Sequence, residues 1–381
     1  MAVRWPDGAL SSGVACGIKS GGAPDLGVIT FEEATAWAGV FTLNAAAAAP
    51  VIWCREHLGE PIRAVVVNSG NANACTGIAG SKAVRATATS AARVAGCAPD
   101  EVLIASTGPI GLPLPTDAIQ AALPRAFAAT GPGVEPFAGA ITTTDTVIKT
   151  SFHAAGGASV VGVAKGAAMI APNMATMLAF IATDAAADRG LLHATLGPAV
   201  QRTFNRISID ACESTNDSVF MFATGRAGRA HPDDLAKAVE AVCGDLAEQI
   251  VQDAEGGTTL VRIRLGGAAS EESAVAAGRA VAASALWRAA VAGADPNWGR
   301  VLSALGAADR SVDITRVSLS IAGVPLFVDG EPTGEVLAAA AAMDSPEVTV
   351  ECDLGSGTGS AELLSADLTE EYVRLNAEGT S

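Results

Sequence analysis

Short apolar runs recur along the chain, and several of them are rich in valine and isoleucine. Two of them, Arg63–Val67 and Val102–Ala105, lead into turns that contain glycine, which is typical of buried strands. The full set of predicted strands is Arg63–Val67, Val102–Ala105, Ser159–Val163, Met177–Ala182, Val219–Ala223, Leu260–Leu265 and Val317–Ile321.

Helical patterns lie between these runs. The predicted helices are Ser81–Ala95, Asp233–Ala254 and Glu271–Ala290. The second begins with two aspartates, which favour a helix N-terminus because of the helix dipole. Mixed strands and helices predict an α/β or layered α+β fold.

Two uncharged stretches are long enough to raise the question of a membrane span. Ala34–Cys54 contains Asn44 and Pro50, and Gly166–Thr183 contains Pro172 near its middle. Such breakers disfavour a membrane helix, so we expect buried strands joined by turns in both stretches. The first ten residues have no apolar core of a signal peptide, and we expect a cytoplasmic protein.

Composition narrows the class of protein further. Half of the 381 residues are apolar and 17% are charged, which predicts a sizeable core in one large α/β domain or in two to three lobes. The formal net charge of −16 disfavours a nucleic-acid partner, because a polyanion is repelled by that average field. Seven cysteines and four histidines show no metal-ligand spacing. We expect buried free thiols in a reducing compartment and no metal site.

Four clusters of small polar residues interrupt the apolar pattern: Asn68–Asn73, Ser106–Gly108, Thr142–Thr146 and Ser214–Asp217. Each adjoins an apolar run. Any one of them is most simply a turn at a strand end, since Asn, Ser, Thr and Gly form turns readily. Four such clusters in one chain could also converge on a pocket that orients a small polar ligand.

The segment from Lys165 to Asp184 carries the most specific chemistry. Its apolar pattern breaks at Pro172 and resumes after Ala175 and Thr176. A threonine hydroxyl needs a base, and no histidine is evidently placed to provide one. Chain cleavage before Thr176 would free an α-amine, with a pKa of about 8, to act as that base. The alternative is an ordinary turn that leads into a buried strand.

Several strings of residues resemble one family from end to end, the bifunctional ornithine acetyltransferase / N-acetylglutamate synthase family of arginine biosynthesis. The matching segments are Ala38–Thr42, Asn68–Gly77, Ser106–Gly108, Thr143–Thr146, Lys165–Thr176, Phe204–Arg206, Ser214–Asp217, Asp295–Arg300 and Tyr372–Asn376. The resemblance implies a layered α/β sandwich of the self-processing, N-terminal-threonine acyltransferase type. It also implies cleavage between Ala175 and Thr176 into an α fragment (1–175) and a β fragment (176–381), paired and assembled as a dimer of such pairs.

The resemblance also implies the chemistry: ping-pong transfer of an acetyl group from N-acetylornithine to glutamate. Thr176 is then the nucleophile, and Thr107 with the Gly108 N–H forms the oxyanion hole. The substrate-contacting positions carried over are Thr143, Lys165, Thr176, Glu255, Asn376 and Ser381. A cation at Lys165 could pair with a substrate carboxylate, and Glu255 with a cationic side chain. No cofactor is implied beyond acetyl-CoA as a secondary acyl donor.

The chain departs from the family pattern near Cys212, Thr259, Trp287 and Gly379. We expect these changes to lie around substrate contacts, where one lost ion pair can change which side chain is accepted. A paralogue that moves an acyl group between other amino acids therefore stays open. So does an N-terminal-nucleophile amidohydrolase or aminopeptidase, in which water is the acceptor. The intact Ala175-Thr176 and Thr107-Gly108 pairs argue against a non-catalytic binding module.

Overall fold

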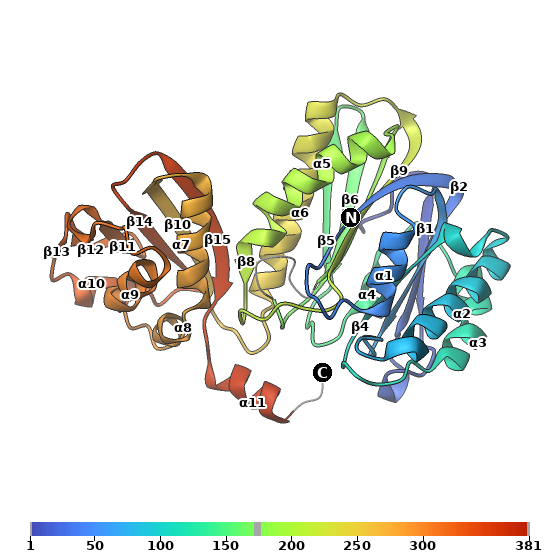
Figure 1. Ribbon diagram of the computed structural model, residues 1–381, viewed down its shortest axis with the longest axis horizontal. Coiled ribbons are helices and arrows are strands. Elements are labelled where there is room, and N and C mark those ends of the chain that lie inside the picture. Colours follow the sequence, from blue (N-terminus) through green and yellow to red (C-terminus); the bar gives the residue numbers. More distant parts are fainter. Residues whose placement is uncertain (1, 171–176, 379–381) are drawn as a thin grey trace.

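The computed structural model describes residues 2–170 and 177–378. Within them the chain forms two lobes, each built on a mixed sheet (Figure 1). The sheet of the first lobe has the strand order β4-β3-β2-β9-β7-β6-β5, with β1 paired to β2. Its strands are β1 (Ala9–Val14), β2 (Leu26–Phe41), β3 (Ile62–Ser69), β4 (Val102–Thr107), β5 (Lys149–Ala155), β6 (Ala158–Lys165), β7 (Leu178–Ala185) and β9 (Ser218–Gly228).

The long strand β2 joins two parts of this sheet. Its first half pairs with β3 and its second half with β9, and the β3 pairing is irregular between Thr30 and Thr35. An interruption of this kind lets a strand bend. The polar ends of β3 and β4 thus come to face the polar ends of β6 and β9, which carry the candidate site.

Helices cover the first sheet in layers. They are α1 (Ala49–Glu56), α2 (Gly77–Ala95), α3 (Thr116–Ala128), α4 (Glu135–Ile141), α5 (Arg189–Arg202) and α6 (Pro232–Gln252). Successive residues of β7 show the layering, because side chains alternate between the two faces of a strand. Phe180 packs edge-on against Phe137 of α4, with ring centroids 5.1 Å apart, whereas Ile181 joins the core under α5 and α6.

The second lobe has the strand order β13-β12-β11-β14-β10-β15-β8. Its strands are β8 (Ile207–Ser208), β10 (Leu260–Ala268), β11 (Ser318–Ile321), β12 (Val324–Val328), β13 (Glu331–Pro332), β14 (Glu347–Asp353) and β15 (Gly359–Ala366). Its helices are α7 (Glu271–Ala283), α8 (Ala285–Ala292), α9 (Trp298–Ala308) and α10 (Val336–Ala342). The last helix, α11 (Glu370–Glu378), leaves this lobe and lies below the first lobe (Figure 1).

The layered α/β prediction is confirmed, and all seven predicted strands are present. Each begins within one residue of the predicted start, but β7, β9 and β10 run three to five residues past the predicted end. The helix predicted over Glu271–Ala290 is wrong as a single element. Ser284 has extended backbone angles, and its side chain accepts the Trp287 N–H, so it caps a separate helix, α8.

The expectation for Ala34–Cys54 is also wrong in part. The stretch contains the end of β2 and most of α1, in which Pro50 occupies the first turn, where a missing N–H costs nothing. In Gly166–Thr183, residues 171–176 lie outside the described part of the chain. No described helix is both long and apolar enough to cross a membrane.

Candidate active site

Lys165, at the end of β6, lies at the centre of the candidate site. Its Nζ donates to Thr143 Oγ1 at 2.8 Å and to Thr107 Oγ1, at the end of β4, at 3.2 Å. Its side chain is only 3% exposed. Burial lowers the pKa of Lys165, and the nearby Asp145 carboxylate opposes that effect. Lys165, which the resemblance assigned to the substrate, is therefore a buried ammonium group between the ends of β4 and β6.

A cavity of about 160 Å³ opens beside this ammonium group. Thr107, Gly108, Thr143, Lys165 and Asn376 all line it. Five of the predicted site residues, from four separate stretches of sequence, thus come together at one cavity. The other lining residues are Ala72, Ile110, Thr144, Ala168, Met169, Asp210, Cys212, Ser214, Thr215, Asn216 and Tyr372.

Glu255 lies next to the cavity rather than on its wall. It follows α6, and its Oε2 accepts the Asn376 side-chain amide at 3.2 Å. Burial raises the pKa of the Glu255 carboxyl, and the Asp210 carboxylate adds to that increase. The last helix, α11, brings Asn376 to this position from the far end of the chain. The cavity is therefore lined by the Lys165 ammonium group and the Asp210 carboxyl group, with the Glu255 carboxyl group beside it.

Three of the predicted positions lie outside the described residues: Ala175, Thr176 and Ser381. The next residue after that gap is informative, because the Met177 N–H donates to Asp217 Oδ1 at 3.0 Å. Asp217 is fully buried, and burial raises its pKa well above the ordinary range, against the effect of that N–H. Its Oδ2 makes no hydrogen bond within residues 2–170 and 177–378.

Sequence reasoning missed Asp210 and Tyr372. Asp210 accepts the backbone N–H groups of Met169, Ile170 (2.9 Å) and Cys212 (3.1 Å), so its carboxylate holds the chain ahead of residues 171–176. Burial raises its pKa, although these N–H groups oppose that effect. Tyr372 lines the cavity with its hydroxyl 3.5 Å from Asp210 Oδ2. Both lie within or beside family-like strings, but nothing in their spacing indicated that they meet.

Asn216 links the two parts of the first lobe beneath the cavity. Its side-chain amide donates to the carbonyls of Ala72 at 2.7 Å and Ser106 at 2.8 Å. Three of the four polar clusters noted in the sequence thus meet through one buried amide. The convergent-pocket interpretation describes them better than four separate turns.

The departures from the family pattern do not all lie at the cavity. Cys212 lines it, but Trp287 is fully buried in α8 against the second sheet. The neighbouring Arg288 donates to the carbonyls of Ala366 and Asp367, at 2.7 and 3.0 Å. The expectation that these changes surround the substrate is therefore wrong for Trp287, whose role is packing. Gly379 lies outside the described residues.

The cysteines only partly match the expectation of buried thiols. All seven are free, but Cys75 and Cys212 are exposed, and burial raises the pKa of Cys54 to about 12. Within the described ranges, no group of three or more His, Cys, Asp or Glu side chains is placed to hold a metal ion.

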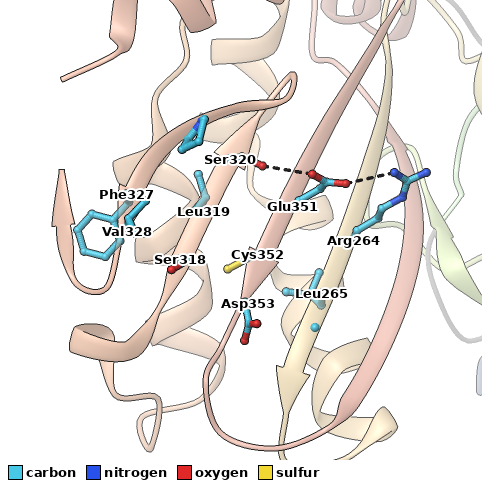
Figure 2. A pocket seen from close by; sticks show the side chains of 12 residues that line it. Arg264, Leu265, Ser318, Leu319, Ser320, Phe327, Val328, Glu351, Cys352 and Asp353 are labelled. Atoms are coloured by element: carbon cyan, nitrogen blue, oxygen red, sulfur yellow. Dashed lines mark hydrogen bonds and ion pairs between the residues drawn. The ribbon is translucent and has the colours of Figure 1, made fainter. Parts of the chain in front are cut away.

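A separate hollow of about 490 Å³ lies on the second sheet, between β10, β11, β12 and β14 (Figure 2). Three of its polar side chains pair with one another: Glu351 accepts from Arg264 at 3.2 Å and from Ser320 at 3.3 Å. None of the residues predicted from the sequence to contact substrate lines this hollow. The cavity at Lys165 is therefore the candidate active site.

Comparison with known proteins agrees with the family resemblance seen in the sequence segments. The ArgJ family matches residues 10–381. The arginine biosynthesis bifunctional protein ArgJ of Thermus thermophilus is 45% identical over 379 residues, which cover 99% of each chain. The protein of the same name from Streptomyces avermitilis is 43% identical over 386 residues and covers all of both chains.

One solved structure supports this assignment. The crystal structure of arginine biosynthesis bifunctional protein argJ from Bacillus halodurans is 35% identical, with a TM-score of 0.51. The match covers 52% of this chain and 98% of that chain. With a family match over nearly its whole length and relatives above 40% identity along all of it, the chain belongs to the ArgJ family.

Proposed function

We propose that this protein is a self-cleaving acyltransferase that moves an acetyl group from N-acetylornithine to glutamate. One observation carries the proposal: in a chain that the ArgJ family matches over residues 10–381, a buried lysine donates to the hydroxyls of Thr107 and Thr143 at a cavity. A cavity lined by both an ammonium group and a carboxyl group, with a second carboxyl group beside it, fits an amino acid with a cationic side chain.

The nucleophile in this proposal is Thr176, freed by cleavage after Ala175. The products are an α fragment (1–175) and a β fragment (176–381). The solved Bacillus halodurans chain supports this division, because nearly all of it matches 52% of the present chain. A fragment that starts at Thr176 would make up about 54% of the chain, and its new α-amine would serve as the base for its own hydroxyl.

The reaction proceeds in two half-reactions. Thr176 Oγ attacks the acetyl carbonyl of N-acetylornithine, and the Thr176 amine takes the hydroxyl proton. Thr107 and the Gly108 N–H stabilise the oxyanion, a charge that exists only in the tetrahedral intermediate. The C–N bond breaks, and ornithine leaves with that proton on its nitrogen. The amine of glutamate then attacks the acetyl-threonine ester and restores the free hydroxyl.

Recognition of the substrate is assigned by charge. Lys165 and Thr143 bind the carboxylate, while Glu255 and Asn376 bind the cationic end of ornithine, with Ser381 as a further contact. The 3.2 Å hydrogen bond between Glu255 and Asn376 supports a shared role. A hydrogen bond to a charged partner contributes about 1.5–3 kcal/mol, enough to separate ornithine from a neutral analogue.

The family match favours transfer to an amine over hydrolysis by an amidohydrolase or aminopeptidase, and over transfer between other amino acids. The proposal includes a dimer of αβ pairs and a cytoplasmic location. It assigns acetyl-CoA the role of a secondary acyl donor and assigns no other cofactor. Light scattering should give twice the chain mass of 37.9 kDa for the dimer, and acetylation of glutamate by acetyl-CoA alone would establish the secondary donor.

The first experiment is the intact mass of the purified protein under denaturing conditions. The proposal predicts two fragments of about 17 and 20 kDa, the larger beginning at Thr176. Brief incubation with N-acetylornithine should add about 42 Da to the larger fragment, the mass of one acetyl group on the threonine. A chain that stays whole, or acetate release that glutamate does not suppress, would contradict the proposal.

A further inference from the structure

A buried ion network lies behind the candidate site. The Lys149 Nζ, on β5, is 2.8 Å from Asp145 Oδ1 and 2.6 Å from Asp253 Oδ2. The Lys149 and Asp145 side chains are fully buried, and Asp253 is nearly so. Burying three charges costs several kcal/mol per ion before their attraction repays it. Such a cluster calls for a role beyond packing.

Asp145 connects this network to the candidate site at three points. Its Oδ2 accepts the Thr143 N–H at 3.0 Å, and its Oδ1 accepts the Gly166 N–H at 2.6 Å. Its Oδ2 also lies 3.8 Å from Lys165 Nζ. Asp145 therefore fixes the backbone of one candidate substrate-contacting residue, and of the residue next to another, and shares its charge between two ammonium groups.

Asp253 anchors the other end of the network. It accepts the backbone N–H groups of Thr146 (3.0 Å) and Val147 (3.4 Å), together with the Thr146 hydroxyl. It lies at the end of α6, two residues before Glu255. The network thus ties the loop that carries Thr143 to the helix end that leads to Glu255.

Five charged groups act on the Lys165 ammonium from the elements packed around it. Asp145, Asp217 and Glu255 favour its charged form, whereas Lys149 and Lys19 disfavour it. Burial opposes the charged form most strongly. Asp145 is the nearest carboxylate, but Lys149 lies closer to it than Lys165 does. Lys149 therefore draws part of the Asp145 charge away from Lys165.

We propose that Asp145 and Lys149 are positioning residues that keep Lys165 charged yet free to bind the substrate carboxylate. Asp145 holds the proton on the Lys165 ammonium and aligns Thr143 beside it. Lys149 prevents Asp145 from closing a full ion pair with Lys165, which would otherwise compete with the substrate. This inference rests on the proposed function and adds the device that prepares the carboxylate-binding end of the site.

The test is the pH profile of kcat/KM for N-acetylglutamate as acetyl donor, with ornithine as acceptor. In a ping-pong reaction this constant reports the first half-reaction alone, so titration of ornithine does not enter. N-acetylglutamate titrates only below about pH 5, so changes above pH 6 report the enzyme. Binding that needs a charged Lys165 is lost as pH rises through the lysine pKa. The profile of kcat/KM therefore falls at high pH, and this fall is its alkaline limb.

The two substitutions should move this alkaline limb in opposite directions. Asp145→Asn removes the group that favours the charged lysine, so the limb should move to lower pH by at least about one unit. Lys149→Met removes a competing cation, so the limb should move to higher pH. Lys149→Arg keeps the charge and should keep the wild-type profile. KM should carry most of each change, and kcat much less.

A purely structural network predicts a different result, because both variants would lose activity without opposite shifts of the limb. Shifts of Asp145→Asn and Lys149→Met in the same direction, or no shift in either, would overturn the inference. If Lys149→Met does not fold, Asp253→Asn replaces it in the test. Lys149 then pairs with Asp145 alone, which leaves less of the Asp145 charge for Lys165, so the alkaline limb should move to lower pH. A wild type that transfers no acetyl group overturns the proposed function as well, whereas active enzyme with an unmoved limb overturns this inference alone.

Discussion

Gly108 offers a sharp test of the candidate oxyanion hole. It follows β4 with a φ of +134°, a conformation that favours glycine. A Cβ atom added there would lie 2.4 Å from the Asn71 backbone nitrogen and 2.5 Å from the Gly70 carbonyl carbon. Because both are backbone atoms, no side chain can rotate away. Gly108→Ala must therefore displace the backbone itself.

The size of the effect follows from that displacement. Ordinary contacts begin near 3.4 Å, so one of the two segments must move by about 1 Å. A displacement of about 1 Å at a catalytic group costs roughly 100-fold in rate. Removal of one oxyanion donor costs about 100- to 1000-fold. We expect kcat to fall about 100-fold, which is about 2.7 kcal/mol of transition-state stabilisation.

Gly111 supplies the matched control. It lies three residues further on with a φ of +86°, and nothing lies within 4 Å of its added Cβ. Both alanine variants carry backbone strain of about 1–3 kcal/mol, but only Gly108→Ala has the clash. Acetyl transfer should be measured per mole of cleaved protein, beside a thermal unfolding curve. A folded Gly108→Ala protein with kcat within twofold of Gly111→Ala would refute the oxyanion assignment.

Three further predictions test other parts of the molecule. Glu255→Gln should raise KM for N-acetylornithine about tenfold and leave KM for N-acetylglutamate unchanged or lower, since a charged hydrogen bond contributes about 1.5–3 kcal/mol; equal changes for both donors would contradict the assigned role. Because the pKa of Asp217 is raised, the folded state holds its proton more tightly, so its contribution to stability is present below about pH 4 and is lost as pH rises through the folded pKa. Asp217→Asn should flatten that decline in the free energy of unfolding, measured by urea unfolding between pH 4 and 8. Phe180→Ala should cost about 3–5 kcal/mol of unfolding free energy, because the ring is fully buried against Phe137 and Phe220; a loss below about 1 kcal/mol would mean that the core refills the cavity.

The local pattern of apolar and polar residues is enough to predict most strands and to single out the polar clusters. The strand at Ser159–Val163 is apolar and β-branched, and it forms β6 as predicted. The helix at Glu271–Ala290 was harder, because alanine-rich sequence carries a helical pattern through Ser284 while that side chain caps a new helix. Pro50 argued against a helix in Ala34–Cys54, but it lies in the first turn of α1. Proline disrupts the interior of a helix and is well tolerated in the first turn. The odd, scattered cysteines excluded a disulfide framework but did not reveal which thiols are exposed.

The order of the residues is enough to identify the family, the apolar segments and the residue types for acyl transfer. Each is local information, carried by strings such as Ser106–Gly108 and Lys165–Thr176. The tertiary structure alone decided which residues meet. Asp145 and Asp253 are more than a hundred residues apart, yet both pair with Lys149, and Asp210 and Tyr372 meet across 162 positions. No spacing rule predicts such pairs, because the bend in β2 and the docking of α11 depend on how the sheets and helices pack.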